Sequence, residues 1–85
     1  MASKLDGELN RLAKAEPERL VPVIVTLKPG ADTKALQAKG LRIKQQLPLI
    51  SGVSGTLTAR DALAVAGLDD VIAVEFDGQM HALDQ

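Results

Sequence analysis

The side chains whose types and spacing come closest to catalytic chemistry are two pairs of carboxylates. Asp69 and Asp70 are adjacent, and Glu75 and Asp77 lie two residues apart near the C-terminal end. General acid and base work needs a pocket that holds two such groups and separates their pKa values. The small residues of the surrounding strands build no such pocket. We therefore expect that the chain is not an enzyme.

The single histidine, His81, gives no support to a metal or triad site. The sequence has no cysteine, so a structural zinc site has too few ligands. His81 lies in the C-terminal tail, beyond the predicted scaffold, where it cannot join a serine and an aspartate. Gly52 and Gly55 join and line two strands rather than opening a helix, so they form no phosphate loop. We expect no metal and no cofactor.

The composition is that of one small globular domain. The chain has 85 residues, 46% of them hydrophobic, and a formal net charge of −1. Lys and Arg are mixed with Asp and Glu, and Phe76 is the only aromatic residue, which argues against a nucleic-acid partner. No apolar run approaches the roughly 20 residues of a membrane span, so we expect no membrane partner. Charge and composition leave the oligomeric state open.

The first residues bear on where the protein is located. They lack the apolar core of a signal peptide. We therefore expect a cytoplasmic protein if the chain is complete, and an extracellular one if it is a fragment of a secreted precursor.

Hydrophobic periodicity predicts an N-terminal helix followed by the order β-α-β-β-α-β. Leu5, Leu9 and Leu12 form one apolar stripe of a helix over residues 3–15, with Ser3 as its cap. This helix is expected to cover an edge or end of the domain or, alternatively, to bind a partner. Strands are expected over residues 21–28, 41–49, 53–58 and 71–76, and further helices over residues 32–39 and 59–66.

Local signals support these boundaries. Pro22 fits only the start or edge of a strand, and Asp32 suits the N-cap of the second helix. Thr58 and Asp61 have capping-box spacing at the start of the last helix. Gly55, inside a strand, indicates close packing or a β-bulge.

Right-handed crossovers on one sheet favour an α+β fold, a ferredoxin-like βαββαβ antiparallel sandwich. The N-terminal helical extension covers residues 1–20, the ferredoxin-like core covers residues 21–78, and an extended C-terminal tail covers residues 79–85.

Both crossover helices are expected on one face of this sheet. Leu47 and Ile72 are expected to point toward that face. The other face stays open, either solvated or ready to bind a protein. It would carry small or polar side chains, namely Ile24, Thr26, Arg42, Lys44, Gln46, Ser54, Thr56, Val71 and Ala73.

The order of several short stretches carries a family resemblance. These are Val23-Ile24-Val25, Lys28-Pro29-Gly30, Leu57-Thr58-Ala59, the acidic-ended strand over residues 70–77, and the ending His81-Ala82-Leu83. In this order, over about residues 21–83, the chain resembles the subtilisin prodomains and the stand-alone protease inhibitors built on the same fold.

The resemblance implies a partner, a subtilisin-like serine protease. The open sheet face would pack on two surface helices of the protease, and Glu75 and Asp77 would cap the N-termini of those helices. Prodomains also act as folding chaperones, because binding to the native protease stabilises it. The sheet-face contacts would include Arg42, Lys44, Thr56 and Ala73.

The resemblance also implies that the tail enters the substrate cleft as an added strand. Leu83 would fill the primary specificity pocket, and Met80 would fill the outer apolar pocket. His81 and Ala82 would lie along the cleft between them.

Two other functions are compatible with the same fold. The first is a ferredoxin-like interaction or assembly domain that forms a homodimer through the open sheet face. The second is a small-molecule regulatory domain, with Gly52 and Gly55 lining a pocket between protomers.

Overall fold

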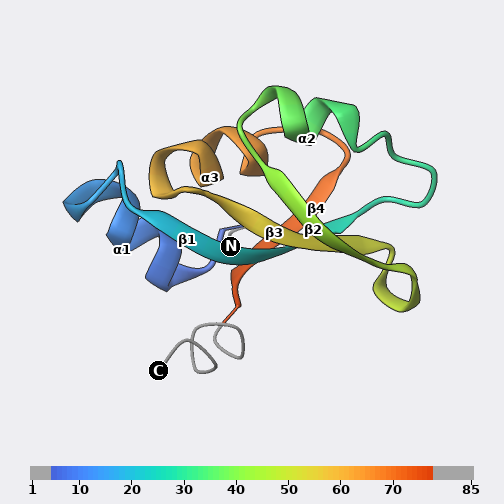
Figure 1. The fold of residues 1–85 in the computed structure, drawn as a ribbon, viewed down its shortest axis with the longest axis horizontal. Helices are drawn as coiled ribbons and strands as arrows, with labels where there is room; N and C mark the ends of the chain where they lie inside the picture. Colours follow the sequence, from blue (N-terminus) through green and yellow to red (C-terminus); the bar gives the residue numbers. More distant parts are fainter. Residues whose placement is uncertain (1–4, 78–85) are drawn as a thin grey trace.

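The elements along the chain follow the predicted order. A computed structural model describes residues 5–77 (Figure 1). The elements are α1 (Gly7–Ala15), β1 (Leu20–Leu27), α2 (Lys34–Ala38), β2 (Arg42–Leu47), the 3-10 helix η1 (Pro48–Ile50), β3 (Gly52–Thr58), α3 (Ala59–Ala66) and β4 (Val71–Phe76).

The four strands form one antiparallel sheet in the order β2-β3-β1-β4. The two central strands are thus β1 and β3, and the edges are β2 and β4 (Figure 1). This is the strand order of a ferredoxin-like α+β fold, so the predicted fold class is confirmed.

The core lies between one face of the sheet and the helices. Val21, Val23 and Val25 of β1 are buried in alternation with half-buried residues, as a strand with one covered face requires. Leu9 of α1 and Leu36 of α2 belong to the same cluster of aliphatic residues. The N-terminal helix therefore shares the core of the sheet and packs against α3 and β4.

The N-terminal helix begins later than predicted. It starts at Gly7, and its cap is Asp6, whose carboxylate accepts a hydrogen bond from the Glu8 N–H at 2.9 Å. The predicted cap, Ser3, lies outside the described residues. Leu5 is buried as predicted, but it pairs with Val74 in a parallel bridge instead of lying on the helix.

A bulge in β2 overturns part of the predicted strand pattern. Ile43 pairs with Gly55, but the next partner of β3 is Gln45, so Lys44 is an extra residue with no place in the register. From Gln45 onward, each residue of β2 lies on the opposite face of the sheet from the one predicted. Leu47, predicted to point inward, lies on the open face, and Gln46 lies on the helix-facing side opposite Val53.

A second bulge, in β4, reverses two further assignments. Thr26 pairs with Ala73 and Leu27 with Val71, which leaves Ile72 as the extra residue. Val71 was expected on the open face, but it is buried at 1% exposure. Ile72 was expected inside, but it is 50% exposed, because the extra residue shifts the alternation at this point.

Two other local signals are confirmed, and a third is corrected. Thr58 caps α3 by accepting a hydrogen bond from the Asp61 N–H at 3.1 Å. The backbone at Gly55 approaches β2 so closely that a Cβ there would collide with the Arg42 carbonyl oxygen, which explains glycine at this place. The helix predicted over residues 32–39 is only five residues long, and its N-cap is Thr33 in place of Asp32.

Candidate functional site

The sheet face turned away from the helices, here called the open face, has three aligned rows of residues from β2 to β4. The register places these residues in order: Arg42, Thr56 and Pro22; then Gln45, Ser54, Ile24 and Glu75; then Leu47, Gly52, Thr26 and Ala73. Leu20 and Thr58 form a further pair on the same face.

The two central strands give this face contrasting surfaces. β1 presents the larger apolar side chains of Leu20, Pro22 and Ile24, and Leu20 is 62% exposed. β3 presents small side chains, and Ser54 is only 6% exposed beside its larger neighbours. The result is a ridge of apolar groups along β1 beside a shallow strip along β3.

Three of the four predicted sheet-face contacts lie on the open face. Arg42 and Thr56 are cross-strand partners, and Ala73 lies opposite Thr26. Lys44 is the extra residue of the β2 bulge and has no partner in the register. Gln45 takes the place that was predicted for Gln46, and only the nearby Gly55 signalled the shift.

The last strand ends in the two predicted acidic residues. Glu75 is exposed and lies opposite Ile24. The Asp77 N–H donates to the Pro22 carbonyl oxygen at 3.0 Å, which continues the pairing with β1 by one more residue. Because side chains alternate along extended chain, both carboxylates belong to the open face.

Pro22 also limits the hydrogen bonds between β1 and the end of β4. The hydrogen bond from Asp77 shows that the main-chain groups of Pro22 point toward β4. Proline has no N–H, so it cannot return a second hydrogen bond to Asp77. The hydrogen bond from Asp77 to Pro22 therefore lies beside the two carboxylates.

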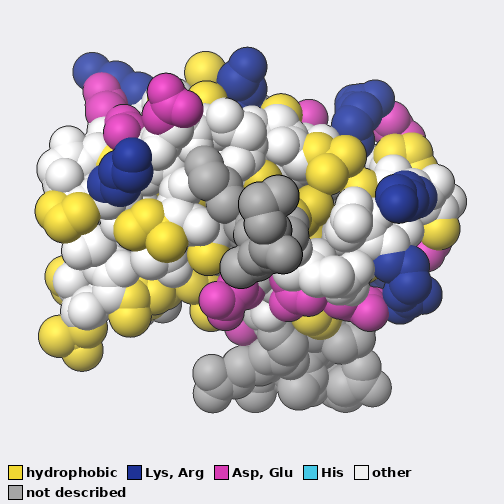
Figure 2. All heavy atoms as spheres, turned by 180° about the vertical axis from the view of Figure 1, so that it is seen from behind, with side chains coloured by type: hydrophobic (Ala, Val, Ile, Leu, Met, Phe, Trp, Pro, Cys, Tyr) yellow, Lys and Arg dark blue, Asp and Glu magenta, His cyan; other side chains and the backbone are white. Residues whose placement is uncertain are grey.

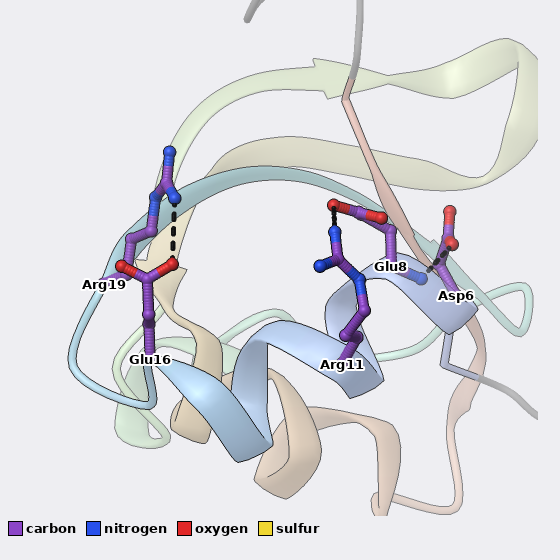
Figure 3. Close-up of polar contacts among 5 residues, drawn as sticks. All are labelled: Asp6, Glu8, Arg11, Glu16 and Arg19. Atoms are coloured by element: carbon purple, nitrogen blue, oxygen red, sulfur yellow. Dashed lines mark hydrogen bonds and ion pairs between the residues drawn. The ribbon is translucent and has the colours of Figure 1, made fainter.

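Asp6 contacts the end of β4, which no sequence pattern indicated. Its N–H donates to the Val74 carbonyl oxygen at 2.9 Å, and its carboxylate lies 3.4 Å from the Phe76 N–H. The same carboxylate caps α1 through the Glu8 N–H (Figure 3). Residues 5–6, here called the strap, thus bind the outer edge of β4 and join it to α1.

A groove of about 470 Å³ lies beside the strap, between α1 and the start of β1. Its apolar lining includes Leu12, Leu20 and Phe76. Two exposed ion pairs lie along its charged rim (Figure 3), Arg11 with Glu8 and Arg19 with Glu16. Exposed pairs of this kind contribute about 0–1 kcal/mol each, so they shape the rim more than they stabilise the fold.

A second groove, also of about 470 Å³, lies at the opposite end of the sheet. Gly52 lines it together with Lys28, Asp32 and Gln46. Hydrophobic side chains gather at the end of the molecule that carries the β2–β3 turn (Figure 2), where Leu49 is fully exposed. Gly55 is not among the lining residues of this groove. The pocket between protomers that both glycines were expected to line stays a prediction.

Met80, His81, Ala82 and Leu83 lie outside the described residues. Within residues 5–77, no three acidic or histidine side chains gather closely enough to hold a metal ion. None of the helices in that range is long and apolar enough to cross a membrane.

Comparisons of the chain with models of protein families, with curated proteins and with solved structures find no match.

Proposed function

We propose that this chain inhibits a subtilisin-like serine protease in the manner of a prodomain. The observation that carries the proposal is the end of β4, where Glu75 and Asp77 share the open face beside the last hydrogen bond of the sheet. Helix N-termini have unpaired N–H groups and partial positive charge, so two aligned carboxylates suit the ends of two helices.

The open face supports this proposal through its shape. Apart from the ridge along β1, its central side chains are small, and a helix can approach such a surface closely. Thr56, which is half-buried, adds a hydroxyl group that can bond to a polar side chain of a partner. Arg42 lies at the opposite edge of the face from the carboxylates, so it contacts a different part of the protease.

The tail completes the proposed mechanism. The Asp77 N–H is held by the Pro22 carbonyl oxygen, and the tail follows Asp77 in the sequence after Gly78. Met80 and Leu83 then supply apolar side chains for two pockets of the substrate cleft, with main-chain pairing as in strand addition. Because the inhibitor binds only the folded protease, the same contacts favour protease folding.

The deciding experiment compares protease inhibition by the full chain and by a chain that ends at Gly78. The tail residues are proposed to fill pockets, as binding hot spots do, so we expect truncation to weaken inhibition by about a hundredfold or more. Circular dichroism of both chains would check that the fold is unchanged. Absence of inhibition by a folded full chain would overturn the proposal and favour the assembly domain.

A second comparison tests the carboxylates. Each helix-terminal charge contributes about 0.3–1 kcal/mol, so Glu75→Ala should weaken inhibition by a few-fold. Asp69→Ala is the matched control, because Asp69 precedes β4 at its other end and is also exposed. Equal effects of the two substitutions would contradict the capping role.

A further inference from the structure

The open face carries larger side chains along one central strand and smaller ones along the other, so two copies of this face can fit together. Along β1 it carries Leu20, Pro22 and Ile24, whereas the β3 residues paired with them are Thr58, Thr56 and Ser54. A large residue therefore lies beside a smaller one in two of the three pairs, Leu20 with Thr58 and Ile24 with Ser54. Packed layers interdigitate when large residues of one face lie over small residues of the other.

Charge is distributed across the same face with opposite signs at its two edges. Arg42 lies at the β2 edge, and Glu75 and Asp77 lie at the β4 edge. Three strand spacings of about 4.8 Å separate these edges, so the charges are too far apart to neutralise one another within the chain. A partner that carries the reversed pattern would pair with both edges.

A second copy of the chain carries that reversed pattern when it is turned about an axis parallel to the strands. This two-fold axis, placed between β1 and β3, puts β2 of one copy over β4 of the other and β1 over β3. Each row then meets the same row of the second copy. Arg42 faces Asp77, Gln45 faces Glu75, and Leu47 faces Ala73, while Ile24 lies over Ser54.

We infer that two copies of this chain associate through their open faces about this axis. The interface is isologous, so each favourable pair occurs twice. Aligned sheets pack at about −30° to each other, which keeps the central rows in contact. An axis across the strands would place β1 over β1 and like charges together, so the size and charge patterns both select the first arrangement.

The edges of the sheet favour contact through the face. The strap covers β4 at Val74, and β2 is interrupted by its bulge and followed by Pro48. Bulges, proline and covering segments all oppose edge-to-edge pairing. The four short strands offer less area than the roughly 800 Å² per partner of a standard interface, so we expect a weak, reversible dimer.

The dimer has a consequence that depends on the function proposed above. It covers the same open face and carboxylates that are proposed to contact the protease. The second copy would therefore act as a concentration-dependent mask of the inhibitor, and the protease would bind the monomer. The dimer itself does not depend on protease inhibition.

The test uses two adjacent glutamines of β2. Gln45 lies on the open face and would meet Glu75 of the second copy, whereas Gln46 lies on the opposite face. In sedimentation equilibrium of the full chain, Gln45→Glu should weaken dimerisation about tenfold, because it creates two like-charge contacts. Gln45→Lys should strengthen dimerisation by a similar factor.

Gln46→Glu is the matched control, because it makes the same chemical change on the other face. It should leave the dissociation constant within about twofold, in line with a substitution outside the interface. Equal effects of Gln45→Glu and Gln46→Glu would overturn the arrangement. A monomeric wild-type chain up to about 1 mM, the limit of weak binding, would overturn the dimer.

The same samples distinguish this inference from the proposed function. A chain that dimerises as described but inhibits no subtilisin-type protease contradicts the function and leaves the dimer intact. A monomeric chain that inhibits contradicts the dimer and leaves the function intact. If both hold, Gln45→Glu should inhibit more strongly per chain than wild type at concentrations above the dissociation constant.

Discussion

The two edges of the sheet are protected in different ways. At the β4 edge, the strap adds a parallel bridge to Val74, and Asp6 hydrogen-bonds to Val74 and Phe76. At the β2 edge, protection comes from a bulge at Lys44 and from Pro48 just after the strand. The chain thus fixes one edge with an added segment and makes the other irregular.

This difference matches the roles proposed for the two edges. The end of β4 carries the carboxylates and delivers the tail, so its position relative to the open face has to be well defined. The Asp6 side chain provides such a connection, because it bonds to both the first turn of α1 and the end of β4. It thereby limits independent motion of the two elements. β2 supplies exposed side chains, which tolerate a less regular edge.

The largest expected effect comes from removing the anchor of α1, which carries the strap. Leu9 is completely buried in the core between α1 and the sheet. Leu9→Ala should lower the free energy of unfolding by about 2–5 kcal/mol, through lost burial and a cavity. Urea denaturation followed by circular dichroism measures this change.

Leu63→Ala is the matched control, because Leu63 lies on α3 but is 45% exposed. It should cost less than about 1 kcal/mol, since much of its surface is already in water. A Leu9→Ala effect as small as that of Leu63→Ala would mean that α1 is not part of the core, and the strap would then lack a firm support.

A smaller loss of stability is expected for a substitution at Gly55, which lies beside the bulge of the edge strand β2. A Cβ at this position would collide with backbone atoms of Arg42 and Ile43, which cannot move aside as a side chain could. Gly55→Ala should therefore destabilise the protein by about 1–3 kcal/mol, the range for overpacking.

Gly7→Ala provides the contrast, since no atom lies within 4 Å of a Cβ placed at Gly7 in the first turn of α1. That change should be neutral or stabilise by up to about 1 kcal/mol. If Gly55→Ala were equally well tolerated, the close approach of β2 and β3 would be wrong.

Sequence patterns predicted the strand order and the main core face, but did not locate the two bulges. The strict alternation of β1 is a local property of Val21, Val23 and Val25, so it can be seen in the sequence. The extra residues Lys44 and Ile72 are defined only by pairing with another strand. Gly55 indicated a bulge near Lys44 without locating the extra residue, and no local pattern marks Ile72. The faces assigned to residues near each bulge were reversed as a result.

The candidate site was predictable to a similar degree. Two-residue spacing on a strand places Glu75 and Asp77 on one face, and proline chemistry places Pro22 near a strand start. The sequence pointed to Ser3 as the cap of the N-terminal helix, whereas the cap is Asp6, and the contact of Asp6 with Phe76 spans 70 residues of sequence. A contact of that kind depends on the tertiary fold, so the sequence could not show that Asp6 connects α1 to the end of β4.

The smallest loss of stability is expected from removing the contacts by which Asp6 connects α1 to the end of β4. Asp6→Ala removes the cap of α1 and the contact with the Phe76 N–H, so it should lower the free energy of unfolding by about 1 kcal/mol. Asp32→Ala is its control, because Asp32 accepts a hydrogen bond from the Lys34 N–H but contacts no strand through it.

Hydrogen exchange separates the two changes. The Phe76 amide should exchange faster in Asp6→Ala than in Asp32→Ala at matched global stability, since local opening at the β4 edge becomes easier. Equal exchange rates would show that Asp6 caps α1 without fixing the end of β4.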